Sequence, residues 1–309
     1  MKFDIVYTYV DSTDISWLNQ KEYYKGGTTD YTNNTSRTDT SLNEILYSIR
    51  SLEKYFRGEY GNIYIVSNNG KLPKFFKESG NIIMIRQEEL MGRLSFNSCA
   101  IESTLHLIPG LSEYYLYFND DFLLNKKLHS SDFLNSSNQL IWYSESNPVI
   151  NFFSYLPYFI NLFPVDGGVC AARERLYLKL GIEGNRPISH SPRLFKKKYI
   201  EDFINTFPNE IYQLRRERFR NEFTFPFVDA FCFWAESKNQ LYFSPAKRTL
   251  IVLQSDESWL VDWYNYYELL DNKNAYFLCI EDVRTNKKNS QYIKDVLDKK
   301  FPIKCKYEV

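Results

Sequence analysis

Three short apolar runs, each followed by a cluster of polar residues, constrain the fold of this chain most. Residues 3–10, 62–66 and 114–118 are rich in β-branched and aromatic side chains, a pattern typical of buried strands. The clusters that follow are Asp11-Ser12-Thr13-Asp14, Ser67-Asn68-Asn69 and Asn119-Asp120-Asp121. Because ligands of open α/β sheets bind beyond the carboxyl ends of the strands, we expect the clusters to converge on one crevice. The alternative is that these Asp and Asn residues only form turns.

Helical patterns alternate with the predicted strands. Residues 42–56 and 99–108 carry apolar side chains at helical spacing, and residues 81–85 predict a further strand. The order strand, helix, strand, strand, helix, strand predicts an α/β fold, with a mostly parallel, Rossmann-like sheet flanked by helices. Residues 19–40 are polar, so we expect a long loop there.

The second half of the chain is predicted to be more helical than the first. The expected helices are 171–180, 192–207, 209–218, 227–237 and 291–300, and the expected strands are 250–253 and 276–280. The sequence contains no internal repeat and no low-complexity linker. We therefore expect a single domain over residues 1–309, with an α/β half (1–140), an insertion-like segment (141–185) and a helical half (186–309).

Composition and charge exclude several classes of protein. The chain has 38 basic and 38 acidic residues, so no net charge favours nucleic acid as a partner. The N-terminus lacks the apolar run of a secretory signal, and no stretch reaches the roughly 20 apolar residues of a membrane span. Five widely spaced cysteines without a CxxC motif indicate reduced thiols, and we expect a cytoplasmic protein. P-loop and dinucleotide-binding glycine motifs are absent.

Asp120 and Asp121 follow a predicted strand and are the first candidates for chemistry. Paired carboxylates suit a divalent cation that bridges a diphosphate, because Mg²⁺ takes one or two carboxylates together with phosphate oxygens. A carboxylate there also suits a general base that acts on an attacking hydroxyl. The residues alone leave both roles open beside that of a simple turn.

His190 and a run of arginines are the next candidates. His190 lies just before Pro192, at the start of a predicted helix, where an anion is favoured. A histidine there suits a proton carrier in phosphoryl transfer, although an ordinary surface histidine is the alternative. Of Arg215, Arg216, Arg218 and Arg220, one directed inward would clamp a phosphate, and the others are expected to be solvated.

Taken together, these motifs resemble those of the Stealth phosphotransferases in four ordered blocks. The first block is FDIVYTYVDSTD at 3–14, followed by Trp17. The second includes YSIRSLEK at 47–54 and ends in YFNDD at 117–121. The third runs from HSPR at 190–193 to Arg220, and the fourth is FLCIED at 277–282.

The resemblance implies transfer of a hexose-1-phosphate, such as GlcNAc-1-phosphate, from a UDP-sugar to a polysaccharide hydroxyl. The product would be a phosphodiester in a bacterial capsule or exopolysaccharide. The core would be similar to the catalytic core of N-acetylglucosamine-1-phosphotransferase. The implied cofactor is Mg²⁺ or Mn²⁺, and the implied partners are a UDP-sugar donor and a polysaccharide or lipid-linked acceptor. The implied location is the cytoplasm, with peripheral contact at the inner face of the plasma membrane.

Residue by residue, the resemblance implies a catalytic group and a wider binding group. The catalytic group is Asp120, Asp121, His190 and Arg220, with Asp120 and Asp121 as metal ligands. The expected nucleotide-binding and substrate-binding residues are Tyr9, Asp11, Ser12, Asp14, Arg37, Glu44, Asn68, Asn69, Glu102, Arg193 and Asp282. The chain departs from the family at Ser12-Thr13, where relatives often have Gly-Ser, at Thr40-Ser41-Leu42, and at Cys99, where Pro is common.

Two rival functions and two surface features stay open. A conventional metal-dependent glycosyltransferase would use the same donor but release UDP, and a non-catalytic carbohydrate-binding protein would not need Asp120 or His190. Residues 152–163 (FFSYLPYFINLF) form either a core or lid element or a platform for the acceptor or a membrane. Residues 196–198 are three lysines that suit a solvated helix face or contact with anionic lipid.

Overall fold

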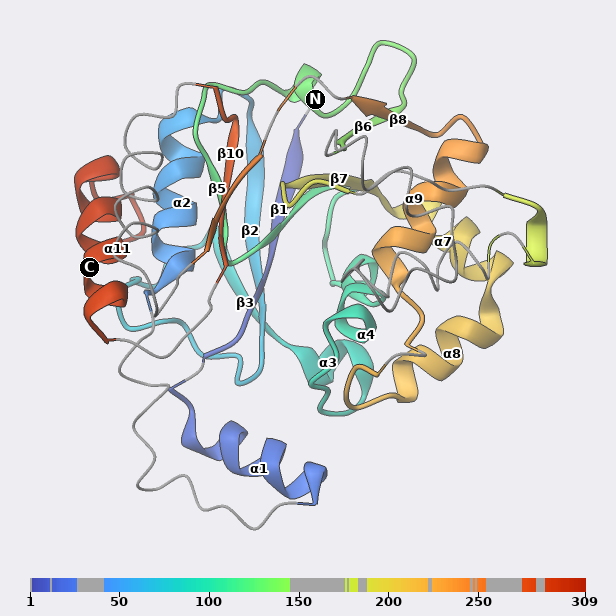
Figure 1. Ribbon diagram of the computed structural model, residues 1–309, viewed down its shortest axis with the longest axis horizontal. Helices are drawn as coiled ribbons and strands as arrows, with labels where there is room; N and C mark the ends of the chain where they lie inside the picture. Colours follow the sequence, from blue (N-terminus) through green and yellow to red (C-terminus); the bar gives the residue numbers. More distant parts are fainter. Residues whose placement is uncertain are drawn as a thin grey trace.

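A five-stranded sheet forms the centre of the molecule in the computed structural model (Figure 1). The structure describes residues 2–11, 13–26, 42–144, 176, 178–182, 188–221, 224–244, 247, 249–253, 274–281 and 287–309. The sheet has the order β3-β2-β1-β4-β7, in which the first four strands are parallel and β7 is antiparallel to β4. The strands are β1 (Phe3–Tyr9), β2 (Tyr60–Ser67), β3 (Ile82–Arg86), β4 (Tyr114–Asn119) and β7 (Arg193–Lys196).

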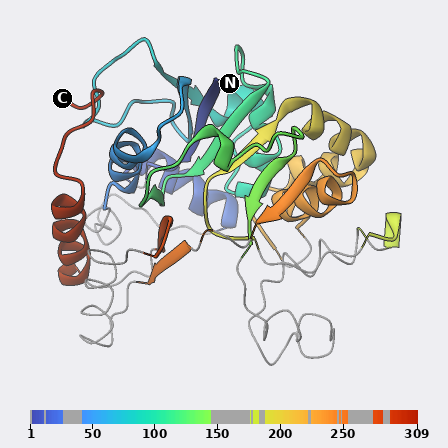
Figure 2. The ribbon, with the colours of Figure 1, turned by 90° about the horizontal axis from the view of Figure 1, so that it is seen from above.

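Helices cover both faces of this sheet, as Figures 1 and 2 show from two directions. On one face lie α2 (Glu44–Tyr55) and α11 (Lys287–Lys300). On the other lie α4 (Ser98–Glu102), α7 (Lys197–Thr206), α8 (Pro208–Arg216) and α9 (Phe227–Ser237). The predicted α/β class, with a mostly parallel sheet flanked by helices, is therefore confirmed.

Two smaller sheets extend the central one. The first has the order β5-β10-β9, where β5 is Phe122–Leu124, β9 is Thr249–Leu253 and β10 is Phe277–Glu281. The second pairs β6 (Leu140–Tyr143) with β8 (Leu241–Ser244) in parallel. The predicted insertion-like segment thus begins within a sheet strand. Residues 152–163 lie outside the described residues.

A helix stands where part of a loop was predicted, so the prediction for residues 19–25 is wrong. Helix α1 (Ile15–Lys25) begins at Asp14, whose Oδ1 accepts a hydrogen bond of 3.1 Å from the Trp17 amide. It ends at Gly26, which has φ 79°, a left-handed conformation that favours glycine. The polar composition conceals this helix because most of its surface is not buried, and only Trp17 and Leu18 are.

Two further predictions of helices need correction. Residues 193–196 form strand β7 because they pair with β4 through the register Tyr117 to Arg193, and helix α7 starts only at Lys197. The helix predicted at 99–108 stops at Glu102. The Ser103 hydroxyl donates to the Ala100 carbonyl at 2.7 Å, which is a side-chain bond that competes with helix propagation.

The C-terminal segment is fixed to helix α2 by an ion pair. Arg50 donates from Nε and Nη2 to the two carboxylate oxygens of Glu308, at 2.7 and 2.6 Å. Its Nη1 donates to the Phe301 carbonyl at 2.8 Å. The side chains of Arg50 and Glu308 are only 10% and 5% exposed, so this bidentate pair is shielded from water.

The described cysteines carry free thiols. Cys99, Cys232, Cys279 and Cys305 are buried and unpaired by disulfides, whereas Cys170 lies outside the described residues. In the part of the chain that the structure describes, no helix has the length and apolarity that a bilayer crossing requires.

Candidate active site

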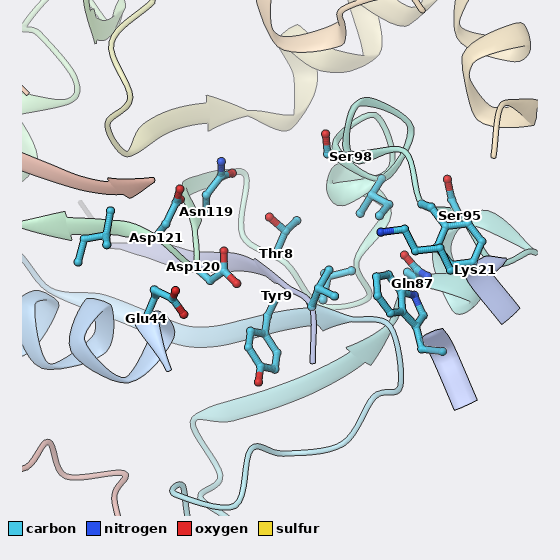
Figure 3. A pocket seen from close by; sticks show the side chains of 16 residues that line it. Thr8, Tyr9, Lys21, Glu44, Gln87, Ser95, Ser98, Asn119, Asp120 and Asp121 are labelled. Carbon is cyan, nitrogen blue, oxygen red and sulfur yellow. The ribbon is translucent and has the colours of Figure 1, made fainter. Parts of the chain in front are cut away.

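A pocket of about 420 Å³ opens at the carboxyl ends of the central strands (Figure 3). Thr8, Tyr9 and Val10 line it from the end of β1, and Asn119, Asp120 and Asp121 line it from the turn after β4. The other lining residues are Trp17, Lys21, Glu44, Val66, Gln87, Ser95, Phe96, Ser98, Ile101 and Ile280. The location agrees with the rule that open α/β sheets bind ligands beyond their strand ends.

One end of the pocket gathers three carboxylates. Asp120, Asp121 and Glu44 lie near one another there, with Glu44 contributed by the first turn of α2 (Figure 3). Burial raises the pKa of Asp120 well above its usual value, and the negative charges of Asp121 and Glu44 raise it further. Such a cluster attracts a cation, because a positive charge would relieve both burial and repulsion.

The turn that carries the aspartates is held by strand β10. The amide of Ile280 donates to the Asp121 carbonyl at 3.1 Å, and the Cys279 thiol donates to the Asp121 carboxylate at 3.5 Å. β10 pairs antiparallel with β5, which immediately follows the turn. The aspartates therefore lie in the turn between β4 and β5, and β10 holds this turn.

Helix α2 fixes the same turn from the other side through two buried serines. The Ser48 hydroxyl donates to the carbonyl of Phe122, and the Ser51 hydroxyl accepts a hydrogen bond of 2.9 Å from the Leu124 amide. Both serine side chains are fully buried. Since Glu44 lies on the same helix, α2 both supplies a carboxylate and sets the position of the strand that begins after Asp121.

The predicted binding residues at the ends of β1 and β2 form a hydrogen-bonded cluster. The Asn68 Oδ1 atom accepts from the Asp11 amide at 2.9 Å. The Asn69 amide group donates to Asp11 Oδ2 at 3.2 Å and to Asp14 Oδ2 at 3.0 Å. The two strand-end clusters converge on each other, as expected, but these four residues do not line the pocket.

A second charged group lies beside the pocket, around Tyr117. Its phenol oxygen is 3.1 Å from Glu102 Oε1, 3.0 Å from Thr8 Oγ1 and 2.6 Å from Asn119 Oδ1. Burial raises the pKa of Glu102 to about 7, although the charges of Arg193 and Arg220 and the Tyr117 hydrogen bond act in the opposite direction. The structure therefore places Arg193 and Arg220 near enough to Glu102 to act on its charge, and all three are among the expected site residues.

Arg193 is itself buried, with 9% of its surface exposed. Its guanidinium lies over the Phe122 ring, 5.5 Å from the centroid, and its Nη2 donates to the Ser189 carbonyl at 3.2 Å. Its Nε has no hydrogen-bond partner among the described residues. Phe122 follows Asp121 directly, so this cation lies close to the aspartate turn.

His190 also lies beside Phe122, but it does not precede a helix as predicted. Its ring is exposed and meets the Phe122 ring edge-on, with 6.4 Å between centroids. The prediction that His190 precedes a helix N-terminus is wrong, because residues 193–196 form strand β7. Any anion near His190 therefore gains nothing from a helix start.

The arginine run does not divide as predicted, because two of the arginines, Arg215 and Arg218, are bonded to backbone carbonyls instead of being solvated. Arg215 donates to the Ser103 carbonyl at 2.6 Å, Arg218 donates to the Leu94 carbonyl at 3.0 Å, and both are therefore engaged. Arg220 is exposed and lies near enough to Glu102 and Cys99 to lower the pKa of each. It therefore borders helix α4, whose Ser98 and Ile101 line the pocket.

The donor set at the aspartates fits only one kind of metal site. Within the described ranges, no group of three or more His, Cys, Asp or Glu side chains is placed to hold a metal ion. Mg²⁺ needs only one or two carboxylates when phosphate oxygens and water complete its shell. The crowded carboxylates Asp120 and Asp121 fit a site of that kind, in which a substrate phosphate supplies the remaining ligands.

Comparisons with known proteins point to one family. The profile of Stealth protein CR2, conserved region 2, matches residues 38–141. The capsular polysaccharide phosphotransferase LcbA of Neisseria meningitidis is 33% identical over 144 residues, which are 44% of this chain and 38% of the relative. An exopolysaccharide phosphotransferase of Streptomyces coelicolor is 25% identical over 314 residues, covering 99% of this chain and 56% of the relative. Residues 38–141 of the chain therefore match a conserved region of the Stealth family, and relatives of the chain are capsular and exopolysaccharide phosphotransferases.

The chain spans 38% and 56% of the lengths of these two relatives. Among solved structures, a galactosyltransferase crystallised with donor and acceptor sugar analogues is 10% identical, with a TM-score of 0.48 and 96% of each chain covered. The matched Stealth region 2 contains six of the predicted site residues, which are Glu44, Asn68, Asn69, Glu102, Asp120 and Asp121.

The structure sorts the predicted site residues of this chain into four sets, of which the first is the hydrogen-bonded cluster of Asp11, Asp14, Asn68 and Asn69 outside the pocket. Those in the pocket are Tyr9, Glu44, Asp120 and Asp121. Those beside it, around Phe122 and Glu102, are Glu102, Arg193, Arg220 and His190. Ser12, Arg37 and Asp282 lie outside the described residues, and their predicted roles stay predictions.

Sequence reasoning missed several residues that line the pocket. Trp17, Lys21, Gln87, Ser95 and Phe96 belong to α1, to α3 (Gln87–Met91) and to the segment before α4. A signal was present for Gln87, because it is a polar residue directly after strand β3, as the aspartates are after β4. No comparable signal marks Lys21, because its helix was taken for a loop.

Proposed function

We propose that this chain transfers a sugar-1-phosphate from a nucleotide-sugar to a hydroxyl of a polysaccharide. The acceptor oxygen attacks the phosphorus that bears the sugar, and a new phosphorus–oxygen bond forms. The bond from that phosphorus to the bridging oxygen breaks, and the nucleoside monophosphate leaves with that oxygen. The acceptor proton passes to a base, and a phosphodiester results.

The observation that carries this proposal is the aspartate turn in the pocket. Asp120 and Asp121 lie within the matched conserved region 2, at the strand ends, beside Glu44. Relatives of the chain are named capsular or exopolysaccharide phosphotransferases. Three crowded carboxylates suit a reaction whose substrate brings a diphosphate and whose charge a divalent cation would balance.

Asp120 and Asp121 would hold the cation, for which we propose Mg²⁺ or Mn²⁺. When bound, such an ion neutralises diphosphate charge and favours departure of the leaving group. Glu44 lies beside the pair and adds a third negative charge, but it belongs to helix α2 and not to a strand end. The hydrogen bonds of Ser48 and Ser51 would hold the two carboxylates in position against the substrate. This position matters, because a misplacement of about 1 Å costs roughly 10²-fold in rate.

The cations beside the pocket suit the transferred phosphoryl group. Arg220 is exposed near Glu102, and Arg193 is buried with an Nε that has no partner among the described residues. We propose that Arg220 contacts phosphoryl oxygens and that Arg193 supports them from within. His190, exposed beside Phe122, or one aspartate would accept the acceptor proton.

The proposed donor is a UDP-sugar, with GlcNAc-1-phosphate as one candidate group, and the acceptor is a polysaccharide or lipid-linked oligosaccharide. The four buried free thiols suit a reducing compartment, so we propose the cytoplasm, including the inner face of the plasma membrane. A peripheral membrane contact is part of this proposal and rests on the acceptor being lipid-linked.

Identification of the released nucleotide tests the proposed reaction. Purified protein would be incubated with Mg²⁺, a panel of UDP-sugars and polysaccharide acceptors, and the nucleotides separated by anion exchange. UMP that appears only with acceptor, and disappears in Asp121→Ala, supports sugar-1-phosphate transfer. UDP as the product would instead identify a conventional glycosyltransferase.

A further inference from the structure

The pocket has a second end, which differs in chemistry from the carboxylate end. Trp17 and Lys21 from α1 and Gln87 from α3 line it, together with Ser95 and Phe96. In Figure 3 the Lys21 side chain points from α1 toward the interior, between Ser95 and Gln87, on the side opposite Asp120 and Glu44. A ligand that fills the pocket would therefore meet acids at one end and these residues at the other.

Two buried donors at this end lack acceptors. Trp17 is 8% exposed and Gln87 is 3% exposed. The indole Nε1 of Trp17 and the amide Nε2 of Gln87 have no hydrogen-bond partner anywhere in the described part of the chain. Leaving a buried donor unsatisfied costs about 1–3 kcal/mol, so native proteins rarely do so without reason. A ligand with acceptor atoms would satisfy both.

The surroundings specify the kind of acceptor. The Lys21 ammonium lies 5.0 Å from the centre of the Trp17 ring, so the third polar group at this end is also a donor. Phe96 packs against Trp17 with 5.4 Å between ring centroids and an interplanar angle of 53°. Aromatic walls of this kind favour a flat ring, and Trp N–H and Gln amide groups are neutral donors suited to carbonyl oxygens.

We propose that Trp17, Lys21 and Gln87 bind the base of the donor nucleotide and select a pyrimidine that carries two carbonyl groups. The proposal rests on the proposed function and deepens it, because it assigns the residues that would recognise the base of the proposed UDP-sugar and select it over cytosine. Uracil presents two carbonyl acceptors to a set of donors. Cytosine replaces one of them with an amine, which would face Gln87 or Lys21 donor to donor.

The size of the pocket agrees with a nucleotide that spans both ends. Its volume of about 420 Å³ lies within the usual range of about 300–1,000 Å³ for small-molecule sites. With the base at Trp17 and Gln87, the phosphates would point toward Asp120 and Asp121. Lys21 would then assist base recognition at the end that lacks carboxylates.

Direct nucleotide binding tests this assignment without any need for turnover. Isothermal titration would measure the affinity of UMP, CMP and ribose 5-phosphate for the wild-type protein and for Gln87→Leu and Lys21→Met. We expect UMP to bind at least about tenfold more tightly than CMP, since a site built to pair with a group rejects analogues that lack it. Gln87→Leu should lose about tenfold in UMP affinity and much of the preference over CMP.

Two controls make the result specific. Gln213→Leu changes an exposed glutamine on α8 and should leave UMP binding unaltered. Thermal denaturation should show Gln87→Leu at least as stable as the wild type, because the substitution removes a buried donor without an acceptor.

Three results would overturn the assignment, and they separate it from the proposed function. If Gln87→Leu and Lys21→Met bind UMP as tightly as the wild type, the base does not lie here, although a nucleotide still binds. If ribose 5-phosphate binds as tightly as UMP, this end takes phosphate rather than a base. If the wild type binds none of the three at millimolar concentration, both the assignment and the proposed donor are wrong.

Discussion

The phenol oxygen of Tyr117 lies 3.1 Å from Oε1 of Glu102 and so joins helix α4 to strand β4. The same phenol is 2.6 Å from Asn119 Oδ1, one residue before Asp120. A tyrosine has one hydroxyl hydrogen, so it donates to only one of these oxygens at a time. The protonation state of Glu102 therefore affects whether the Tyr117 hydroxyl donates to Glu102 or to Asn119, the residue before the aspartate turn.

Glu102 should make the stability of the protein depend on pH. Its folded-state pKa of about 7, raised chiefly by burial, lies above its usual 4.5, so the folded state binds the proton more tightly than the unfolded state. Its contribution to stability is then greatest below about pH 4.5 and falls as pH rises toward 7. Glu102→Gln should remove this fall, which we expect to be about 3 kcal/mol.

Thermal denaturation of wild type and Glu102→Gln at pH 5 and pH 8 measures this effect. The melting temperature of Glu102→Gln, relative to that of the wild type, should be higher at pH 8 than at pH 5. Glu78→Gln, which changes an exposed carboxylate, serves as the control and should follow the wild type. An identical pH response of Glu102→Gln and wild type would contradict the raised pKa.

Asp120→Asn should abolish transfer and yet stabilise the fold. Loss of a cation ligand should lower kcat by about 10³-fold or more. The same change removes a buried charge that repels Asp121 and Glu44, so the melting temperature at pH 7 should rise. Rate and melting curves would be compared with those of Asp202→Asn, which alters an exposed ion pair with Lys198. A variant that is destabilised, or that turns over normally, would refute this role.

Arg50→Met should destabilise the protein by about 3 kcal/mol, because it leaves the Glu308 carboxylate shielded from water without its partner. Urea denaturation at pH 7 measures the change in unfolding free energy. Lys25→Met is a matched comparison, since Lys25 pairs with Glu22 at 3.3 Å on an exposed helix surface and should cost less than about 1 kcal/mol. Equal costs for the two variants would show that the C-terminal segment is not held by Arg50.

Ser51→Ala should affect the site as well as the fold. It leaves the Leu124 amide without the hydroxyl that accepts its hydrogen bond, at a cost of about 1–3 kcal/mol. Since β5 begins directly after Asp121, we also expect kcat to fall several-fold at temperatures where the variant is fully folded. Ser137→Ala changes an exposed serine and should do neither. Normal turnover in folded Ser51→Ala would mean that β5 does not position the aspartates.

The sequence predicted the central fold well because apolar runs such as 3–10 and 114–118 are long enough to identify buried strands. It failed where local pattern and long-range pairing disagree. Residues 193–196 have a sequence compatible with a helix but gain backbone hydrogen bonds by pairing with β4. Helix α1 was missed because its polar surface resembles that of a loop, whereas its cap at Asp14 becomes evident only from the contact with Trp17.

The candidate site was predictable only in part, for a similar reason. Asp120 and Asp121 stand at a strand end, and the family resemblance singles them out. Gln87 and Trp17 become candidate binding residues only in the structure, where their buried donors lie beside the pocket and have no acceptor among the described residues. No spacing rule joins α1, β3 and α4 in sequence, because the pocket is assembled by tertiary packing.

The most direct test of the central claim follows the sugar-bearing phosphorus of the donor. A nucleotide-sugar labelled at that phosphorus would be incubated with acceptor and the protein, with Asp120→Asn as the blank, and the polymer separated from free nucleotide. We expect label in the polymer, in a phosphodiester, with unlabelled nucleoside monophosphate released. Label that stays in a released nucleoside diphosphate, while sugar enters the polymer, would contradict it.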